Sequence, residues 1–227
     1  RAMSAALLSC GLATLVVRHA GIGDLVQYTM PQPPLYGSYQ EFAIVLGAVI
    51  AIGVVLFDKT QSLLPKFDRK SPKMIVIALL SFAVIGVMAM YFPEILGNGK
   101  AGNQLTFTDL VGWDYALGLL ATKWIAVLLA LMAGAYGGRI TPSMMLGSTL
   151  ALAFAALWSI MVSPVHLGFA AFIGAVIFLG LAQKMPLTSC VFMLELSRFS
   201  VEMCFPMALA MGSALITQQI VKARFQL

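Results

Sequence analysis

The sequence predicts an all-α protein that crosses the membrane several times, and three observations lead to this prediction. Hydrophobic residues make up 60% of the 227 residues. Charged residues make up only 10%, against about 25% in soluble domains, so too little polar surface is present to cover a soluble core. The apolar residues also fall into long runs, which are separated by short segments rich in glycine, proline or charge.

The apolar segments, in chain order, lie at 2–17, 42–57, 74–92, 115–136, 143–162, 165–183, 186–197 and 203–221. A straight crossing of the ~30 Å hydrocarbon core needs about 20 residues. Only some of these segments qualify, chiefly 74–92, 143–162 and 203–221. The segment 42–57 is marginal, and 186–197 is too short. Such unequal lengths predict tilted, broken or partly penetrating helices, as in channels and transporters whose irregular backbone lines a cavity.

The first apolar run begins at the start of the chain and has no convincing signal-peptide cleavage site. We therefore expect it to be a membrane helix and the chain to be a fragment of a longer protein.

Basic residues gather in the linker 58–73, which contains Lys59, Lys66, Arg69, Lys70 and Lys73. Because basic loops stay in the cytoplasm, the positive-inside rule predicts a cytoplasmic linker. Lys222 and Arg224 predict the same side for the C-terminus, whereas 18–41 and 93–114 are poor in basic residues and are expected on the opposite side. The basic residues form no face typical of nucleic-acid binding, so no nucleic-acid partner is expected.

The stretch GAYGGRITPSMMLG, residues 134–147, joins two of the apolar segments. Thr141-Pro142 offers an N-cap residue followed by proline, which favours a helix start. A helix that begins within the membrane has N–H groups without intrahelical partners, and its dipoles place about half a positive charge there.

Gly137 and Gly138 carry no Cβ, so an anion can approach this backbone closely. The alternative is an ordinary turn at the membrane surface, in which the two glycines cap a helix and Arg139 reaches into the headgroups.

Four landmarks resemble those of the CLC family, the chloride channels and proton–chloride exchangers, in order and spacing. GGRITP at 137–142 is similar to the family's GGxFxP motif. FIGAVIFLGLAQKMPLTSCVFMLELS at 172–197 resembles the stretch that contains RAPLT, and FPEILGNG at 92–99 resembles the PE(I/V)LGxG turn. Lys123 lies where family members place a basic residue in the preceding helix.

The resemblance implies transport of chloride or a similar small anion across a membrane, as a voltage-gated-type chloride channel or an H+/Cl− antiporter. It implies that the amides of Arg139 and Ile140 coordinate the anion, that Gly137 and Gly138 shape the approach, and that Thr141 starts the helix. Arg139 replaces the apolar residue usual in the family. Its side chain is expected either to hold the anion more tightly or to point away and pair elsewhere.

Two further ionisable residues are candidates. Lys123 lies within an apolar run, and an ionisable residue at that depth is a functional candidate. The resemblance implies a long-range positive charge that favours anions in the pore, and the alternative is a structural ion pair or a side chain that snorkels to the interface. Glu195 resembles a carboxylate common in the family, for which we expect a structural hydrogen-bonding role rather than a proton relay.

The resemblance also implies a homodimer, with contacts from helices near 2–17, 187–196 and 202–220. In the last of these, the small residues Gly212-Ser213-Ala214 would allow close approach, although lipid contact would give a similar pattern.

The resemblance covers only the second half of a CLC membrane domain. The family's GSGxP and GxEGP turns are not found in this sequence, and its pore tyrosine would fall at or just beyond the C-terminal KARFQL. We therefore expect residues 1–227 to be a partial CLC-type transmembrane domain in a cell membrane, either inner or plasma.

No cofactor or metal is expected, because the three cysteines lack metal-ligand spacing. No motif for a catalytic nucleophile is present, so we do not expect an enzyme. Two alternatives remain open. One is a cation-coupled secondary permease for an organic solute, and the other is a truncated fragment without activity.

Overall fold

The computed structural model describes residues 2–20, 28–29, 39–65, 67, 71–135, 137–197 and 203–225. These residues form helices and connecting turns, with no strand among them, which confirms the predicted all-α class. The basic linker is described only in part, because Lys66, Arg69 and Lys70 lie outside the described residues.

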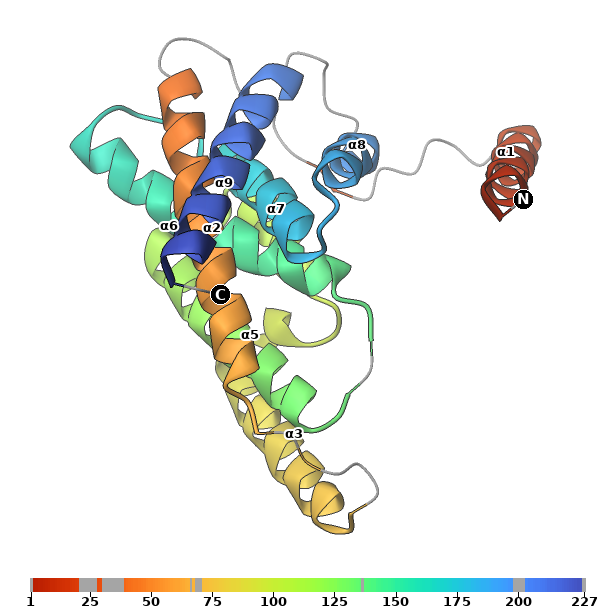
Figure 1. The fold of residues 1–227 in the computed structure, drawn as a ribbon, viewed down its shortest axis with the longest axis vertical. Coiled ribbons are helices and arrows are strands. Elements are labelled where there is room, and N and C mark those ends of the chain that lie inside the picture. Colours follow the sequence, from red (N-terminus) through yellow and green to blue (C-terminus); the bar gives the residue numbers. More distant parts are fainter. Residues whose placement is uncertain are drawn as a thin grey trace.

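The described helices are shown in Figure 1. They are α1 (Ala2–His19), α2 (Tyr39–Ser62), α3 (Lys73–Tyr91), the 3-10 helix η1 (Pro93–Ile95), α4 (Lys100–Phe107), α5 (Trp113–Met132), α6 (Ile140–Met161), α7 (Leu167–Ala182), α8 (Pro186–Ser197) and α9 (Cys204–Phe225). Each predicted apolar segment overlaps one of these helices. Helix α4 was not predicted, because its sequence KAGNQLTF is short, polar and contains glycine.

Five of the described helices, α2, α3, α5, α6 and α9, are long and apolar enough to cross a bilayer. The marginal length predicted for 42–57 is wrong, because α2 has 24 residues and continues through polar residues at both ends. Helix α8 has 12 residues, which agrees with the prediction that 186–197 is too short to cross.

Helix α7 forms the centre of the molecule, and every residue from 168 to 181 is buried. It packs on α6 where Gly147 and Gly174 face each other, so closely that a Cβ on either glycine would collide with the other's carbonyl oxygen. Such small residues permit close helix packing in membranes. Helix α6 runs obliquely to α2 and α9 in Figure 1, and its beginning therefore lies inside the molecule's length rather than at one end.

Helices α2 and α9 pack along each other through small residues. A Cβ on Gly47 would collide with the Ala210 carbonyl, and the Ser213 hydroxyl donates to the Ile44 carbonyl. Ala214 is fully buried. Of the small residues that were expected to serve dimer contacts, Ser213 and Ala214 therefore contribute to packing within this chain.

Candidate functional site

Helix α5 ends in a glycine cap that does not involve Gly137–Gly138. Gly134 has a φ of 75°, and its N–H donates to the Leu131 carbonyl at 3.0 Å. The Ala135 N–H donates to the Ala130 carbonyl at 2.9 Å. This pair of bonds is the Schellman arrangement, which satisfies the last carbonyls of a helix. The capping role that the surface-turn alternative assigned to Gly137–Gly138 is therefore filled by Gly134.

Helix α6 begins at Ile140, with Arg139 as its N-cap residue. The predicted cap, Thr141, is instead the second helical residue, and Pro142 is the third. Proline is tolerated there because the N–H groups of a helix's first turn have no intrahelical acceptor. The first bond of the helix runs from the Ser143 N–H to the Arg139 carbonyl at 3.1 Å. The N–H groups of Arg139, Ile140 and Thr141 find no acceptor among the described residues.

Gly137 and Gly138 leave the approach to this helix start open. Both are exposed, and a Cβ added to either would meet no described atom within 4 Å. Neither residue has a positive φ. These glycines are therefore required neither by backbone conformation nor by packing, and their effect in the structure is to leave the main chain uncovered.

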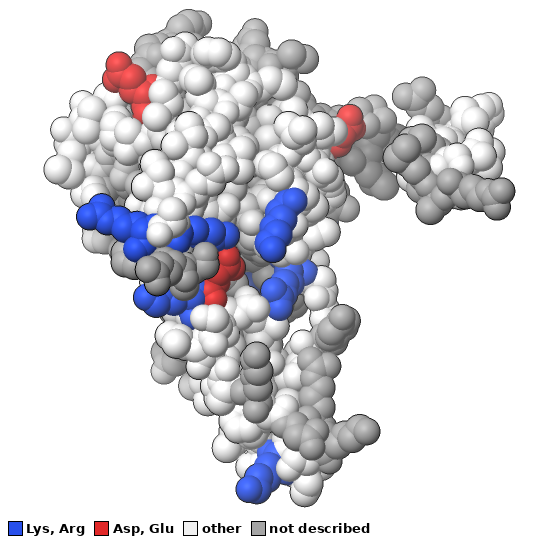
Figure 2. Space-filling view, viewed as in Figure 1, with Lys and Arg blue, Asp and Glu red and all other residues white. Residues whose placement is uncertain are grey.

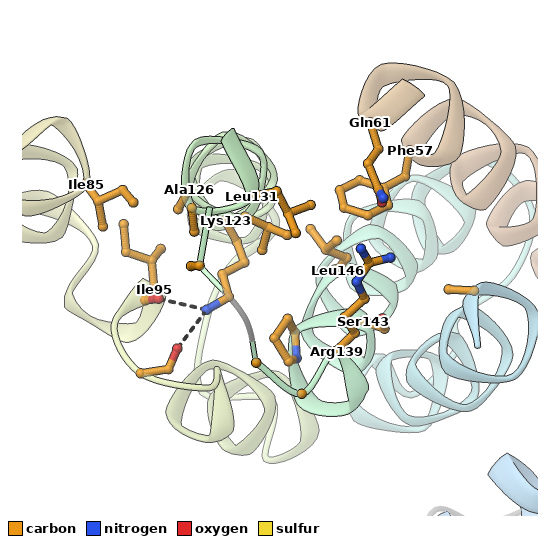
Figure 3. Close-up of a pocket in the computed structure, with 18 of the residues that line it drawn as sticks. Phe57, Gln61, Ile85, Ile95, Lys123, Ala126, Leu131, Arg139, Ser143 and Leu146 are labelled. Carbon is orange, nitrogen blue, oxygen red and sulfur yellow. Dashed lines mark hydrogen bonds between the residues drawn. The ribbon is translucent and has the colours of Figure 1, made fainter. Parts of the chain in front are cut away.

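A cavity of about 770 Å³ lies beside the turn, between α2, α3, α5, the η1 turn and the beginning of α6 (Figure 3). Its polar and charged lining consists of Asp58, Gln61, Lys123, Arg139, Ser143 and Gln183. Gly137 and Gly138 also line it. The cavity thus brings Lys123 together with the predicted glycine turn. Ile140 and Thr141 do not line it, and Ile140 is 40% exposed.

Lys123 lies in the middle of α5 and is only 3% exposed. Its Nζ donates to the Ile95 carbonyl at 2.7 Å and is 3.4 Å from the Gly97 carbonyl (Figure 3). Within the described part of the chain, no carboxylate forms an ion pair with it. Its partners are carbonyls of the FPEILGNG turn, so the structural ion pair that the sequence left open is not formed here. A buried ammonium without an opposite charge is costly, and a nearby anion would offset that cost.

Asn103, which sequence reasoning missed, fixes α4 against the beginning of α6. It is fully buried, and its Nδ2 donates to the Thr141 carbonyl at 3.4 Å. Its Oδ1 accepts a hydrogen bond from the Ser148 hydroxyl at 3.1 Å. The neighbouring Gly102 also packs against α6, since a Cβ there would collide with the Met145 side chain. An amide within a short polar segment gives no periodic signal.

The Arg139 side chain is exposed and points from the turn toward Gln61 and Phe57 of α2, away from Lys123 (Figure 3). Asp58, one residue further along α2 than Phe57, interacts electrostatically with Arg139. The Arg139 side chain therefore points away from the backbone turn, and its pairing with another residue stays a prediction.

Glu195 lies on α8, outside the residues that line the cavity. Its side chain is exposed, and it has no hydrogen bond to another described residue. The structural hydrogen-bonding role expected for it stays a prediction. Within the described residues, no group of three or more His, Cys, Asp or Glu side chains is placed to hold a metal ion.

Comparisons with known proteins show the family to which the chain belongs. The family model described as voltage gated chloride channel matches residues 1–219. Two relatives named H(+)/Cl(-) exchange transporter ClcA, from Vibrio vulnificus strains YJ016 and CMCP6, are each 26% identical over 231 residues. A third protein of that name, from Vibrio parahaemolyticus, is 24% identical over 232 residues.

The alignments cover 95–96% of this chain but 48% of each of these relatives, so the chain spans about half the length of the curated relatives it matches. The family match extends over nearly all 227 residues and includes each of the landmarks described above. The chain therefore belongs to the voltage-gated chloride channel family, the CLC family, and is an integral membrane protein with several apolar spans.

Proposed function

We propose that the protein carries chloride or a similar small anion across a membrane, and that the anion rests against the first turn of α6. One observation carries the proposal. A single cavity is lined both by the uncovered backbone of Gly137–Arg139 and by Lys123, a buried cation without a carboxylate partner among the described residues. The relatives named as H(+)/Cl(-) exchange transporters support the same ion.

In the proposed mechanism, the ion exchanges its water for backbone N–H groups at the beginning of α6. The amides of Arg139 and Ile140 donate to it, and the helix dipole adds about half a positive charge. Thr141 contributes the next free N–H of the same turn, and Gly137–Gly138 leave room for the ion's approach. Lys123 acts at longer range by making the cavity positive. Because partial charges bind an ion less tightly than a salt bridge does, the ion can leave as well as enter.

The depth of the turn supports this mechanism. Lys123 and the carbonyls that it binds lie at the level of the middle of α5. In Figure 1 the first turn of α6 lies between the levels of the two ends of α2, which is long enough to span a bilayer. In this proposal the turn lies within the hydrocarbon region, where unsatisfied N–H groups cost on the order of several kcal/mol each unless a ligand accepts from them.

Two interactions support the proposed orientation of the chain in the membrane. Asp58, near the end of α2, interacts electrostatically with Lys222, near the end of α9, which supports a common side for the predicted cytoplasmic linker and C-terminus. The Gln104 amide donates to the Thr29 carbonyl at 2.9 Å, which joins two segments that are both poor in basic residues. We place the linker after α2 and the C-terminus on the cytoplasmic side of an inner or plasma membrane.

In this proposal, residues 1–227 form one half of a CLC-type membrane domain, and the natural protein forms a homodimer. Glu195 on the exposed face of α8 then meets a hydrogen-bond donor from outside this chain's described residues. The described residues offer no observation that favours the organic-solute permease left open by the sequence.

The test is radiolabelled chloride flux into liposomes that contain the natural protein carrying this chain. We expect flux well above that of empty vesicles, and equal flux would overturn the proposal. A second measurement distinguishes an anion transporter from a permease for an organic solute. Bromide and nitrate should raise the unfolding temperature of the purified protein, whereas amino acids and sugars should leave it unchanged.

A further inference from the structure

The last turn of α2 is fixed firmly at one edge of the cavity. The indole N–H of Trp124 on α5 donates to the Thr60 hydroxyl at 3.2 Å. Phe57 packs edge-on against Trp124, with ring centroids 5.0 Å apart, and against Phe178 on α7, with centroids 6.0 Å apart. These contacts hold Asp58 and its helical turn in a defined position beside the beginning of α6.

Positive charges from three other parts of the chain act electrostatically on Asp58, without an ion pair to it among the described residues. It interacts with Lys222 on α9, Lys184 in the turn between α7 and α8, and Arg139 before α6. Figure 2 shows basic side chains gathered around an acidic one near the middle of the visible face. Of these four charged residues, Asp58 and Arg139 line the cavity itself, together with the amides of Gln61 and Gln183.

Stability alone is a weak explanation for this arrangement. Asp58 and Arg139 are both exposed, and exposed charge pairs contribute about 0–1 kcal/mol. Their influence on a third charge is a different matter, because charges at the edge of a cavity with apolar walls act on any ion inside it. The apolar part of the wall includes Ile85, Ala126 and Leu146. The pair is thus better placed to act on a mobile ion than to hold the fold together.

We propose that Arg139 and Asp58 act as an opposed pair that sets the affinity of the cavity for its anion. The inference rests on the proposed function and concerns the same cavity. Arg139 raises the positive potential on the path to the first turn of α6. Asp58 lowers that potential and draws the guanidinium toward α2, so that Arg139 attracts the ion without trapping it against the backbone.

This assignment explains why an arginine can occupy a position beside the backbone amides. A full positive charge at an N-cap residue, with nothing to balance it, would strengthen anion binding and slow release. Asp58 supplies that balance from α2. The residues are affinity-determining, since neither is needed for the ion to reach the amides.

The experiment measures the chloride concentration that gives half-maximal flux, in liposomes at constant ionic strength, for the natural protein that carries this chain. Arg139→Leu should raise this concentration about threefold to tenfold, and Asp58→Asn should lower it by a similar factor, as expected for one unit charge at the cavity edge. Arg139→Lys should restore most of the affinity. In the double variant, the effect of Asp58→Asn should shrink, because Asp58 acts partly through Arg139.

Lys100→Met is the matched control, since Lys100 is exposed on α4 and does not line the cavity. Its loss should leave the half-maximal concentration within twofold of the unsubstituted protein. The inference is overturned if Arg139→Leu and Asp58→Asn both behave like this control, or if their effects add fully in the double variant. Both outcomes require a protein that transports chloride, so they are distinct from failure of the proposed function, in which the unsubstituted protein gives no flux.

Discussion

Helices α6 and α7 follow one another along the chain, yet their first turns are built in opposite ways. At the beginning of α7, Gly168 lies so close to the Phe107 carbonyl that a Cβ there would collide with it, and Phe169 and Ala170 are fully buried. At the beginning of α6, the Gly137–Gly138 pair faces open space and a cavity. One helix start is closed by protein, and the other is left uncovered.

The difference teaches that a helix N-terminus is not in itself an anion site. Both starts have the same free N–H groups and the same dipole. What distinguishes α6 is an open approach and a nearby buried cation, Lys123, which has only carbonyl partners among the described residues. The residues lining the cavity include Ala182 and Gln183 from the end of α7 and its following turn, but none from its beginning.

The largest expected effect comes from a substitution at the beginning of α7, which is closed by protein. Gly168→Leu should destabilise the protein by about 3 kcal/mol or more, because its Cβ has no space beside the Phe107 carbonyl and the backbone must shift. Thermal unfolding in detergent and size-exclusion chromatography would show a lower unfolding temperature and aggregated protein. An unfolding temperature equal to that of the unsubstituted protein would mean that the beginning of α7 is not closed as described.

The next effect tests the cation beside α6. Lys123→Met keeps the length and apolar stem of the side chain but removes its charge, so chloride flux should fall at least about tenfold, or about 1.4 kcal/mol in the barrier. Stability should change by less than about 2 kcal/mol, because loss of two hydrogen bonds is offset by removal of a buried charge. Undiminished flux from a folded Lys123→Met protein would contradict the proposal that Lys123 makes the cavity beside α6 favourable for anions.

Much of this fold could be predicted from the sequence, since hydropathy and helix punctuation are local signals. The apolar segments, the all-α class and the short length of 186–197 follow from such signals. The start of α6 was placed at Thr141 rather than Ile140, because a Thr-Pro pair fits the second and third positions of a helix as well as it fits the cap. The extent of α2 was underestimated for a similar reason, since its polar ends do not differ in composition from a loop.

The cavity could be predicted only in part. The glycine turn and Lys123 were found from a local motif and a lone charge in an apolar run. Asp58 and Asn103 were not found, because their roles depend on which helices lie side by side, and no periodic pattern in one segment encodes that. Asp58 had been counted as part of a charged linker, whereas it lines the cavity from the last turn of α2.

A smaller effect is expected from covering the open helix start. Gly138→Leu places a side chain where a Cβ meets no described atom, so the unfolding temperature should stay close to that of the unsubstituted protein. The same side chain fills the approach to the amides of Arg139 and Ile140. We expect the half-maximal chloride concentration to rise about fivefold, which corresponds to about 1 kcal/mol. Flux measurements at several chloride concentrations distinguish a higher half-maximal concentration from a lower maximal rate. An unchanged half-maximal concentration would place the ion elsewhere in the cavity.

The smallest expected effect concerns the pH dependence of stability near the beginning of α7. Asp109 follows α4, and burial raises the pKa of its carboxyl group above the ordinary value of 3.8, while the positive charge of His166 at the N-cap of α7 opposes that rise. A raised pKa means that the folded state holds the proton more tightly than the unfolded chain does. The stabilisation is therefore complete below the unfolded pKa and is lost as pH rises through the folded pKa. Thermal unfolding should show a slightly higher stability near pH 4 than near pH 6, and Asp109→Asn should flatten that difference. A slope that survives Asp109→Asn would assign the pH dependence to another group.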